Sequence, residues 1–417
     1  MAKKERDLAA DLFMAGVHAA APNTITRQSV LNNIEQFHNR PVTVIATGKA
    51  ALPMITGALE ALANCDIVRA IAVTNRENIA DLRGVDVFPA GHPVPDTEGL
   101  RAAEEIIECV SSLSQDDVLL FLVSGGTSAM LPAPAGDLTL ADEIAATEML
   151  LASGAPIDVV NAIRSRLSKV KGGGLSRLAG QASINTLMLS DVPGDDPAVI
   201  GSGPTIASHT SDDDMAAMLN AYGLDRRFNE AVLAELHKPS VSFEVDLGPR
   251  FSAVIGSNKI SLDAVVSAAT KRSLHVEVVS EWLDGDVDEA SRRFALAAGA
   301  CKQRPAVLIA GGETTVQLVG DGKGGRNQEL ALRFIMHAKD VQGPWVFLSG
   351  GTDGRDGPTD AAGGLIDHMT LSRIGVEGLK AALGNNDAYH ALQQSGDLLM
   401  TGATGTNVAD LQILLLQ

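Results

Sequence analysis

Residues 42–63, VTVIATGKAALPMITGALEALA, pass directly from a β-branched run into a helical pattern. The run at 42–47 is apolar at most successive positions, as expected of a strand that is buried on both faces of a parallel sheet. Gly48 and Lys49 form the connection, and the helical pattern starts at Ala50. A strand, a short turn and a helix in this order indicate an open α/β sheet.

The same alternation of strand and helix continues along the chain. Further strands are predicted in two series, at 67–73, 117–123 and 183–190 and then at 251–255, 274–279, 305–309, 314–319 and 344–349. We predict two domains: an N-terminal Rossmann-like α/β domain of residues 1–238 and a smaller C-terminal α/β domain of residues 239–417. The first has a mainly parallel sheet with helices on both faces. A last buried strand is predicted at 408–417 and could return to the first domain.

The composition narrows the class of protein. Hydrophobic residues make up 45% of the 417 residues and aromatic residues only 3%, which suits aliphatic cores of helices on a sheet. The formal net charge of -18 opposes binding to nucleic acid or to an anionic membrane. Cys65, Cys109 and Cys301 show no CxxC spacing, so neither a disulfide framework nor a zinc site is predicted. Without a signal peptide or a long apolar run, a cytoplasmic protein is expected.

A loop rich in glycine and hydroxyl groups follows the strand predicted at 117–123. Its members are Ser124, Gly125, Gly126, Thr127 and Ser128. Ligands of open α/β sheets bind at the carboxyl ends of strands, where glycine lets the backbone approach a ligand closely. The loop can therefore hold phosphate or carboxylate oxygens, or it can be an ordinary strand-to-helix turn with a Ser or Thr cap.

Two cations lie where the helix dipole disfavours them. Lys49 precedes one predicted helix, and Arg326 opens another after Gly324 and Gly325 and before Asn327. A cation at a helix N-terminus is unfavourable, so an anionic ligand nearby would explain both residues. A surface lysine or arginine remains the simpler alternative.

Aspartates recur after predicted strands. Asp191 and Asp195 lie in SDVPGDDPAVIGSGPT, and Asp353 lies in SGGTDGRDGPTD. Carboxylates at a strand end can hold Mg²⁺, although Asp-rich turns also form without a metal. His92 lies in GHPVPD, where a structural role in a rigid turn is the preferred interpretation.

Two common nucleotide motifs give little support here. The GxxxxGK[ST] motif of P-loop ATPases is absent. A GxGxxG match occurs at Gly320, Gly322 and Gly325, after the strand predicted at 314–319, and is the only sequence support for a dehydrogenase. In a chain with 41 glycines, such a match is expected by chance.

Taken together, the glycine-rich segments resemble the class II glycerate 2-kinase family, whose C-terminal half is called the MOFRL domain. The similar segments span nearly the whole chain in family order and include ATGKAALPM, GHPVPD, LVSGGTSAMLPAP, NAIRSRLSKVKGGGLSRLA, SDVPGDDPAVIGSGPT, IGSN, AGGETTVQLVGDGKGGRNQELAL, SGGTDGRDGPTDAAGGLID and TGATGTNVADLQILL. Some relatives carry the name hydroxypyruvate reductase, so an NAD(P)H-dependent reductase is the alternative function.

The resemblance implies transfer of the ATP γ-phosphoryl group to the 2-hydroxyl of D-glycerate, which gives 2-phosphoglycerate. It implies an active site in the cleft between the two domains, with Lys49 and Arg326 as catalytic cations. The residues expected to bind substrate or nucleotide are Ser124, Gly125, Gly126, Thr127, Ser128, Asn258, Gly324, Gly325 and Asn327. Mg²⁺ is expected on Asp191, Asp195 or Asp353. The expected partners are glycerate and ATP, with a homodimer left open.

Overall fold

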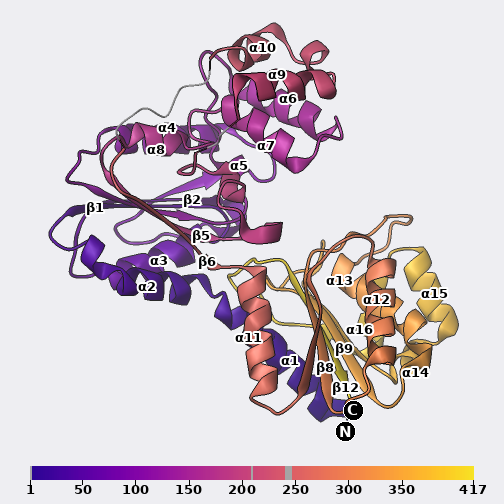
Figure 1. Cartoon of the computed structure of the whole chain (residues 1–417). Coiled ribbons are helices and arrows are strands. Elements are labelled where there is room, and N and C mark those ends of the chain that lie inside the picture. The colour runs from indigo at the N-terminus through magenta and orange to yellow at the C-terminus, as the bar shows by residue number, and fades with distance from the viewer. Residues whose placement is uncertain (1, 208–209, 240–246) are drawn as a thin grey trace. The chain divides into compact units, whose positions relative to one another are not determined.

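The computed structural model of the chain describes residues 2–207, 210–239 and 247–417 (Figure 1). The chain forms two compact units, Pro22–Ile255 and a second one made of Met1–Ala21 with Gly256–Gln417. Each unit is built around one six-stranded sheet.

The sheet of the 22–255 unit has the strand order β3-β2-β1-β4-β5-β6. Its strands are β1 (Pro41–Thr47), β2 (Asp66–Asn75), β3 (Asp86–Ala90), β4 (Val118–Val123), β5 (Ser183–Leu189) and β6 (Arg250–Gly256). Strands β1 to β5 pair in parallel, as in doubly wound folds. Thr47 pairs with Val73 of β2 and with Val123 of β4, so the carboxyl ends of these three strands lie side by side at the same end of the sheet.

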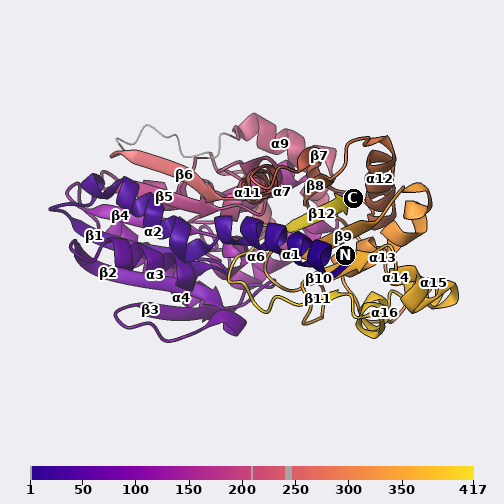
Figure 2. The ribbon, with the colours of Figure 1, turned by 90° about the horizontal axis from the view of Figure 1, so that it is seen from below.

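Helices cover both faces of this sheet, because successive strand residues point to opposite sides. Val44 and Leu120 pack towards α2 (Pro22–Asn32) and α3 (Ala51–Ala61). Ile45 and Phe121 pack on the opposite face, towards α4 (Thr97–Ser111) and α8 (Gly174–Leu178). Figure 2 shows α2 and α3 running together along the sheet.

A small helical cluster belongs to the same unit and has its own core. Leu150, Ile163, Leu219 and Val232 are buried together in this core. The helices are α6 (Leu140–Leu151), α7 (Ile157–Arg166), α9 (Asp212–Ala221) and α10 (Glu230–Leu236), with the short α5 (Thr127–Met130) preceding them. The cluster is built from two segments of the chain, since α6 and α7 lie between β4 and β5 whereas α9 and α10 lie between β5 and β6.

The second sheet is mixed and has the order β11-β10-β9-β12-β8-β7. Its strands are β7 (His275–Leu283), β8 (Ala306–Gly312), β9 (Trp345–Gly351), β10 (Gly363–Asp367), β11 (Leu398–Leu399) and β12 (Asp410–Leu416). β7 and β8 are parallel, and the other described pairings are antiparallel.

The second sheet is also covered on both faces. Alternate residues of β8 separate the two cores, with Ile309 packing towards α1 and α11 and Leu308 towards the other helices. One layer consists of α1 (Ala2–Ala19) and α11 (Asn258–Thr270). The opposite layer contains α12 (Val287–Ala300), α13 (Arg326–His337), α14 (Thr370–Ile374), α15 (Val376–Gly384) and α16 (Ala388–Ser395).

The predicted two-part α/β architecture is confirmed, but the parts are divided differently along the chain. The predicted boundary at 238/239 lies before β6, which completes the first sheet, and α1 packs on the second sheet. The last strand, β12, does not return to the first sheet but lies between β8 and β9. Residues 314–319 form no strand, only an isolated bridge from Thr315 to Asp286.

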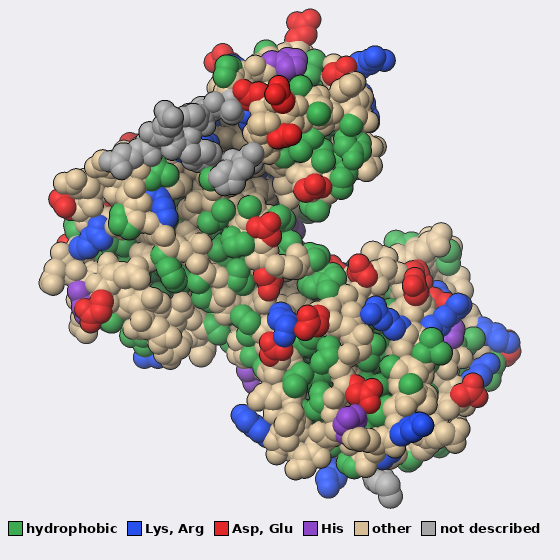
Figure 3. All heavy atoms as spheres, viewed as in Figure 1, with side chains coloured by type: hydrophobic (Ala, Val, Ile, Leu, Met, Phe, Trp, Pro, Cys, Tyr) green, Lys and Arg blue, Asp and Glu red, His purple; other side chains and the backbone are tan. Residues whose placement is uncertain are grey.

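On the face shown in Figure 3, acidic and basic side chains are scattered among apolar and neutral ones. The apolar residues are concentrated in the sheet cores described above. Within the described residues, no helix combines the length and the apolar character that crossing a membrane requires.

Candidate functional site

The loops after β1 and β4 are joined by hydrogen bonds at one edge of the first sheet. The N–H of Lys49 donates to the carbonyl of Gly125 (2.9 Å), and the N–H of Ala50 donates to Oγ of Ser124 (3.1 Å). Gly48 has a φ of 108°, and a Cβ there would clash with Ser124. Only glycine allows this approach, so the position of Lys49 depends on Gly48.

Two backbone donors of the β4 loop are available to a ligand. Among the described residues, no acceptor takes the N–H groups of Gly125 and Gly126. Neighbouring free N–H groups at a strand-to-helix turn form a cradle for an anion. This geometry favours the ligand-binding interpretation of the loop.

The ammonium group of Lys49 lies beside this loop and is also available. Its side chain is half-buried, and within the described part of the chain no carboxylate lies within ion-pair distance of Nζ. Burial lowers the pKa of His92, and the charge of Lys49 lowers it further. Burial raises the pKa of Asp191, whereas Lys49 opposes this shift. Lys49, His92 and Asp191 therefore share one electrostatic environment.

Asp191 and His92 border the two glycines of the loop. A Cβ on Gly125 would clash with the carboxylate of Asp191, and a Cβ on Gly126 would lie 3.0 Å from Cδ2 of His92. The structure thus brings together Lys49, the loop and Asp191. It adds His92, which the sequence favoured as a structural residue. The sequence could have indicated this role of His92, because the residue follows β3, whose carboxyl end lies at the same end of the sheet.

Not every hydroxyl of the loop faces a ligand. Thr127 is buried, donates from Oγ1 to the carbonyl of Ser124 (2.8 Å) and hydrogen-bonds Thr47 through Oγ1 (3.0 Å). Ser128 shares a 2.8 Å hydrogen bond with Ser202. These hydroxyls hold the loop in shape. Asp195 lies in the turn that follows Asp191 and has a φ of 54°.

A second set of predicted residues surrounds the start of α13 in the other unit. Nε and Nη2 of Arg326 donate to the two carboxylate oxygens of Asp410 (2.6 and 3.0 Å), and Nη1 pairs with Glu313 (2.7 Å). Asp410 is 1% exposed and Arg326 is 33% exposed. A guanidinium has five N–H donors, so three bonds fix its plane and leave donors for a ligand.

Two predicted ligands, Asn327 and Asn258, are instead buried in hydrogen-bonded positions. The amide oxygen of Asn327 accepts from Oγ of Ser349 (2.6 Å). Nδ2 of Asn258 donates to the carbonyls of Val408 and Asp410, each at 2.8 Å. Asn258 therefore holds the start of β12, which carries Asp410, and so supports Arg326 indirectly.

The glycines before α13 allow close packing around Asp356. A Cβ on Gly325 would clash with the Asp356 carboxylate, and a Cβ on Gly324 would lie 3.3 Å from Ala388. Oδ1 of the predicted metal ligand Asp353 accepts the N–H of Arg355 (2.9 Å). Within the described residues, none of the three predicted metal aspartates belongs to a cluster of three or more candidate ligands.

Asp356 is a buried carboxyl group with a strongly raised pKa. Burial is the main cause of the rise to about 7, and the nearby Asp410 adds to it. The N–H groups of Gln328 and Asn327, which donate to the carboxylate at 2.8 and 3.1 Å, act in the opposite direction. Ionising Asp356 is therefore harder in the folded protein than in the unfolded chain.

We expect the free energy of unfolding to show this as a pH dependence. Because the folded pKa of Asp356 exceeds the unfolded value, its contribution to stability falls as pH rises towards 7 and is constant above about 8. Between pH 5.5 and 7, the free energy of unfolding of wild type should fall by about 2 kcal/mol relative to that of Asp356→Asn. Urea unfolding of both proteins at pH 5.5, 7 and 8.5 measures this. An equal difference at all three pH values would contradict the prediction.

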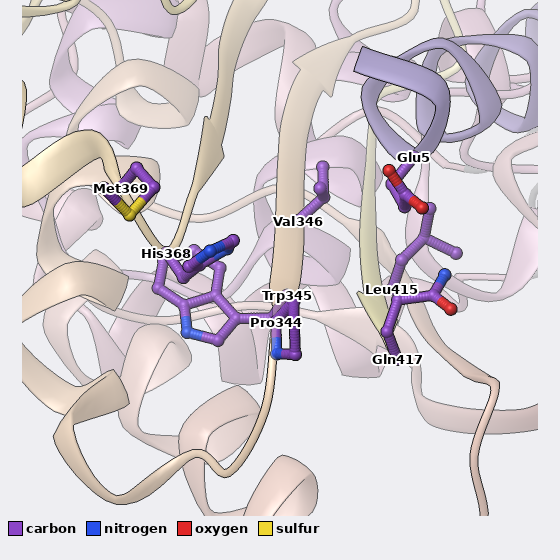
Figure 4. Close-up of a pocket in the computed structure, with 8 residues that line it drawn as sticks. All are labelled: Glu5, Pro344, Trp345, Val346, His368, Met369, Leu415 and Gln417. Carbon is purple, nitrogen blue, oxygen red and sulfur yellow. The ribbon is translucent and has the colours of Figure 1, made fainter. Parts of the chain in front are cut away.

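A separate pocket of about 220 Å³ lies elsewhere in the second unit (Figure 4). It is lined by Glu5, Pro344, Trp345, Val346, His368, Met369, Leu415 and Gln417. Trp345 begins β9, whereas Gly351 at the other end of that strand pairs with Asp410. The pocket therefore lies at the end of the strands opposite to Arg326, and none of the predicted site residues lines it.

The GxGxxG match does not have the context of a dinucleotide site. The preceding segment is not a strand, and the N–H groups of Val319 and Gly320 both donate to Oδ1 of Asn386 (2.7 and 3.0 Å). A dinucleotide fingerprint requires a strand before its glycines and free N–H groups at the following helix. The sequence support for a dehydrogenase is thereby removed.

Comparison with known proteins identifies the family. A family described as a domain of unknown function (DUF4147) matches residues 8–237, and the MOFRL family matches residues 306–410. The D-glycerate 2-kinase of Thermotoga maritima is 35% identical over 98% of this chain and 97% of its own length. The chain belongs to the glycerate 2-kinase family. The resemblance predicted from the glycine-rich segments is thus confirmed.

Solved structures of similar proteins support the glycerate 2-kinase fold. The crystal structure of the Thermotoga maritima glycerate kinase has a TM-score of 0.90 at 34% identity and covers 100% of both chains. A protein of Pyrococcus horikoshii has a TM-score of 0.83 at 31% identity, with 99% of this chain and 98% of that chain covered. A relative from Agrobacterium vitis, 36% identical over 97% of this chain and 93% of its own length, bears the provisional name hydroxypyruvate reductase.

Proposed function

We propose that this member of the glycerate 2-kinase family transfers the γ-phosphoryl group of ATP to the 2-hydroxyl of D-glycerate. The observation that carries the proposal is the ammonium of Lys49, unpaired among the described residues, beside the free N–H groups of Gly125 and Gly126. The names of the similar glycerate kinases supply the substrate class. In an acidic chain, a local cation with free backbone donors is what a nucleotide or a carboxylate substrate needs.

The chemistry requires positioning and charge stabilisation more than covalent participation by the protein. Lys49 and the glycine N–H groups would neutralise one set of anionic oxygens. Arg326, whose plane is fixed by Asp410 and Glu313, would donate its remaining N–H groups to another set. We propose that both residues serve the same reaction and that the phosphoryl group moves directly between the substrates.

Two assays on the purified chain test this function. We expect ADP release from ATP that depends on D-glycerate, and a product that enolase alone converts to phosphoenolpyruvate. A product that enolase accepts only after a phosphoglycerate mutase is added would place the phosphate on the 3-hydroxyl. NADH oxidation by hydroxypyruvate without any kinase activity would overturn the proposal in favour of a reductase.

Mg²⁺ is part of the same proposal, and Asp191 fits it best. Mg²⁺ is commonly held by one or two carboxylates, with phosphate oxygens and water at the other positions. The Asp191 carboxylate borders Gly125 within the candidate phosphate loop. When bound, Mg²⁺ would neutralise charge on the ATP phosphates. Asp353 already accepts an N–H from Arg355 and is the alternative holder.

The choice of Asp191 gives a direct prediction. Asp191→Asn should raise the Mg²⁺ concentration for half-maximal rate by about tenfold, because a neutral amide binds Mg²⁺ more weakly than a carboxylate. Asp195→Asn, in the next turn, should leave this concentration unchanged. Initial rates measured across a Mg²⁺ titration at saturating substrates give the comparison. An effect at Asp195 and none at Asp191 would reverse the assignment.

A further inference from the structure

A cluster of three potential metal ligands in the second unit contains none of the residues assigned to the proposed reaction. His275 and Glu277 are two residues apart on the edge strand β7, so they share one face of the sheet. Cys301 directly follows α12. One ligand atom from each of the three residues lies within 4.8 Å of the other two. The set offers an imidazole nitrogen, a carboxylate oxygen and a thiol sulfur.

The spacing of these atoms is close to that of a tetrahedral metal site. Nε2 of His275 lies 3.0 Å from Oε1 of Glu277. Zinc binds sulfur at about 2.3 Å and nitrogen or oxygen at about 2.0–2.2 Å. Tetrahedral ligands at those lengths are separated by roughly 3.2–3.8 Å. The observed separations, 3.0 Å for the His275 and Glu277 pair and within 4.8 Å for the whole set, bracket that range.

The partial exposure of two of the three side chains also suits a metal that enters from solvent. The His275 and Glu277 side chains are 34% and 40% exposed, while Cys301 is 6% exposed. Zinc would thus have three protein ligands and an open fourth position for water. The sequence could not reveal the site, because Cys301 lies 24 residues or more from its partners and none of the usual ligand spacings occurs.

We propose that His275, Glu277 and Cys301 form a zinc site that links the edge strand β7 to the end of α12. Zinc suits this mixed nitrogen, oxygen and sulfur set, whereas Mg²⁺ prefers oxygen ligands alone. The thiol proton leaves to solvent when the metal binds. The guanidinium of Arg304 lies nearby, since its Nη1 donates to the carbonyls of Cys301 and Gln303, each at 2.8 Å. Its positive charge opposes the binding of zinc.

The zinc site and Arg326 lie towards opposite ends of β8 in the second unit. His275 pairs with Ala306 at the start of β8, whereas Asp410 pairs with Gly312 at its end. Six residue steps along a strand separate these positions by roughly 20 Å. Metal binding here would stabilise the edge of the second sheet and requires no kinase activity.

The test uses the full chain, free of any polyhistidine tag and stripped of metal with a chelator. Zinc is titrated against a chromogenic chelator, and cobalt serves as a spectroscopic substitute. Wild type should bind one zinc per chain, show a thiolate-to-cobalt charge-transfer band and melt at a higher temperature with zinc. Cys301→Ser should bind zinc at least about 100-fold more weakly, because it loses the thiolate ligand. Cys109→Ser is the matched control and should behave as wild type.

His275→Gln provides a second variant, because this side chain is partly exposed and its replacement leaves the core intact. It should also lose the zinc-dependent rise in melting temperature. The proposal is wrong if wild type binds no more zinc than Cys301→Ser, or if cobalt binds without the thiolate band. Neither readout depends on glycerate or ATP, so failure of the kinase proposal would leave this result unaffected.

Discussion

Lys49→Ala should lower kcat for glycerate phosphorylation by at least about 100-fold and leave the protein folded. The ammonium has no ion-pair or hydrogen-bond partner among the described residues, so its removal leaves no buried group unpaired. The glycine loop stays in place, because Lys49 is joined to it through its main-chain N–H. The free energy of unfolding should therefore change by less than about 1 kcal/mol.

Steady-state kinetics and urea unfolding measure the two parts of this prediction. Lys169→Ala, at an exposed lysine of the same unit, is the control for loss of one positive charge. If both alanine variants retained near-wild-type kcat, Lys49 would have no part in the reaction. If Lys49→Ala unfolded at much lower urea concentration, the lysine would be structural.

Arg326→Ala should lower both turnover and stability. Loss of a guanidinium that stabilises phosphoryl charge typically costs about 10³-fold or more in kcat. The buried ion pair with Asp410 gives Arg326 a structural role as well. Asp410 is 1% exposed, and breaking a buried pair from one side costs about 3 kcal/mol, because the remaining carboxylate has no partner.

A double variant separates the two effects. In Arg326→Ala/Asp410→Asn, the unpaired buried charge is gone, so the free energy of unfolding should recover in part while kcat stays low. Arg333→Ala is a matched control two turns further along α13, where Arg333 pairs with Glu329 at 2.8 Å. It should destabilise the protein without lowering kcat of the folded fraction. Full recovery of kcat in the double variant would show that Arg326 acts only through stability.

Apolar runs predicted strands such as β4, β8 and β12 well, because these strands are buried along their whole length. They could not show which sheet a strand joins. The run at 251–255 is β6 of the first sheet, separated from β5 by the helices α9 and α10. The run at 314–319 has β-branched residues, but its N–H groups near Gly320 are bound by Asn386 instead of a neighbouring strand.

The sequence could predict those site residues that directly follow parallel strands. It could not predict contacts between residues that lie far apart along the chain. Lys49, Gly125 and Asp191 follow parallel strands, so their proximity follows from the sheet order. The partner of Arg326 is 84 residues away on an antiparallel strand that local patterns cannot place. The family resemblance implied that Asn258 is a ligand, yet its amide is used to hold β12.

The position of β12 between β8 and β9 has a consequence for synthesis of the chain. Residues 22–255 contain every strand of their sheet, so this unit can form while the rest is still being translated. The other sheet lacks a central strand until residues 410–416 emerge from the ribosome, so the surface on which α1 packs, formed by α11, β9 and β12, is complete only then. A nascent chain stalled before residue 410 should therefore expose the apolar face of α1 and recruit chaperones, whereas release of the finished chain should end that exposure.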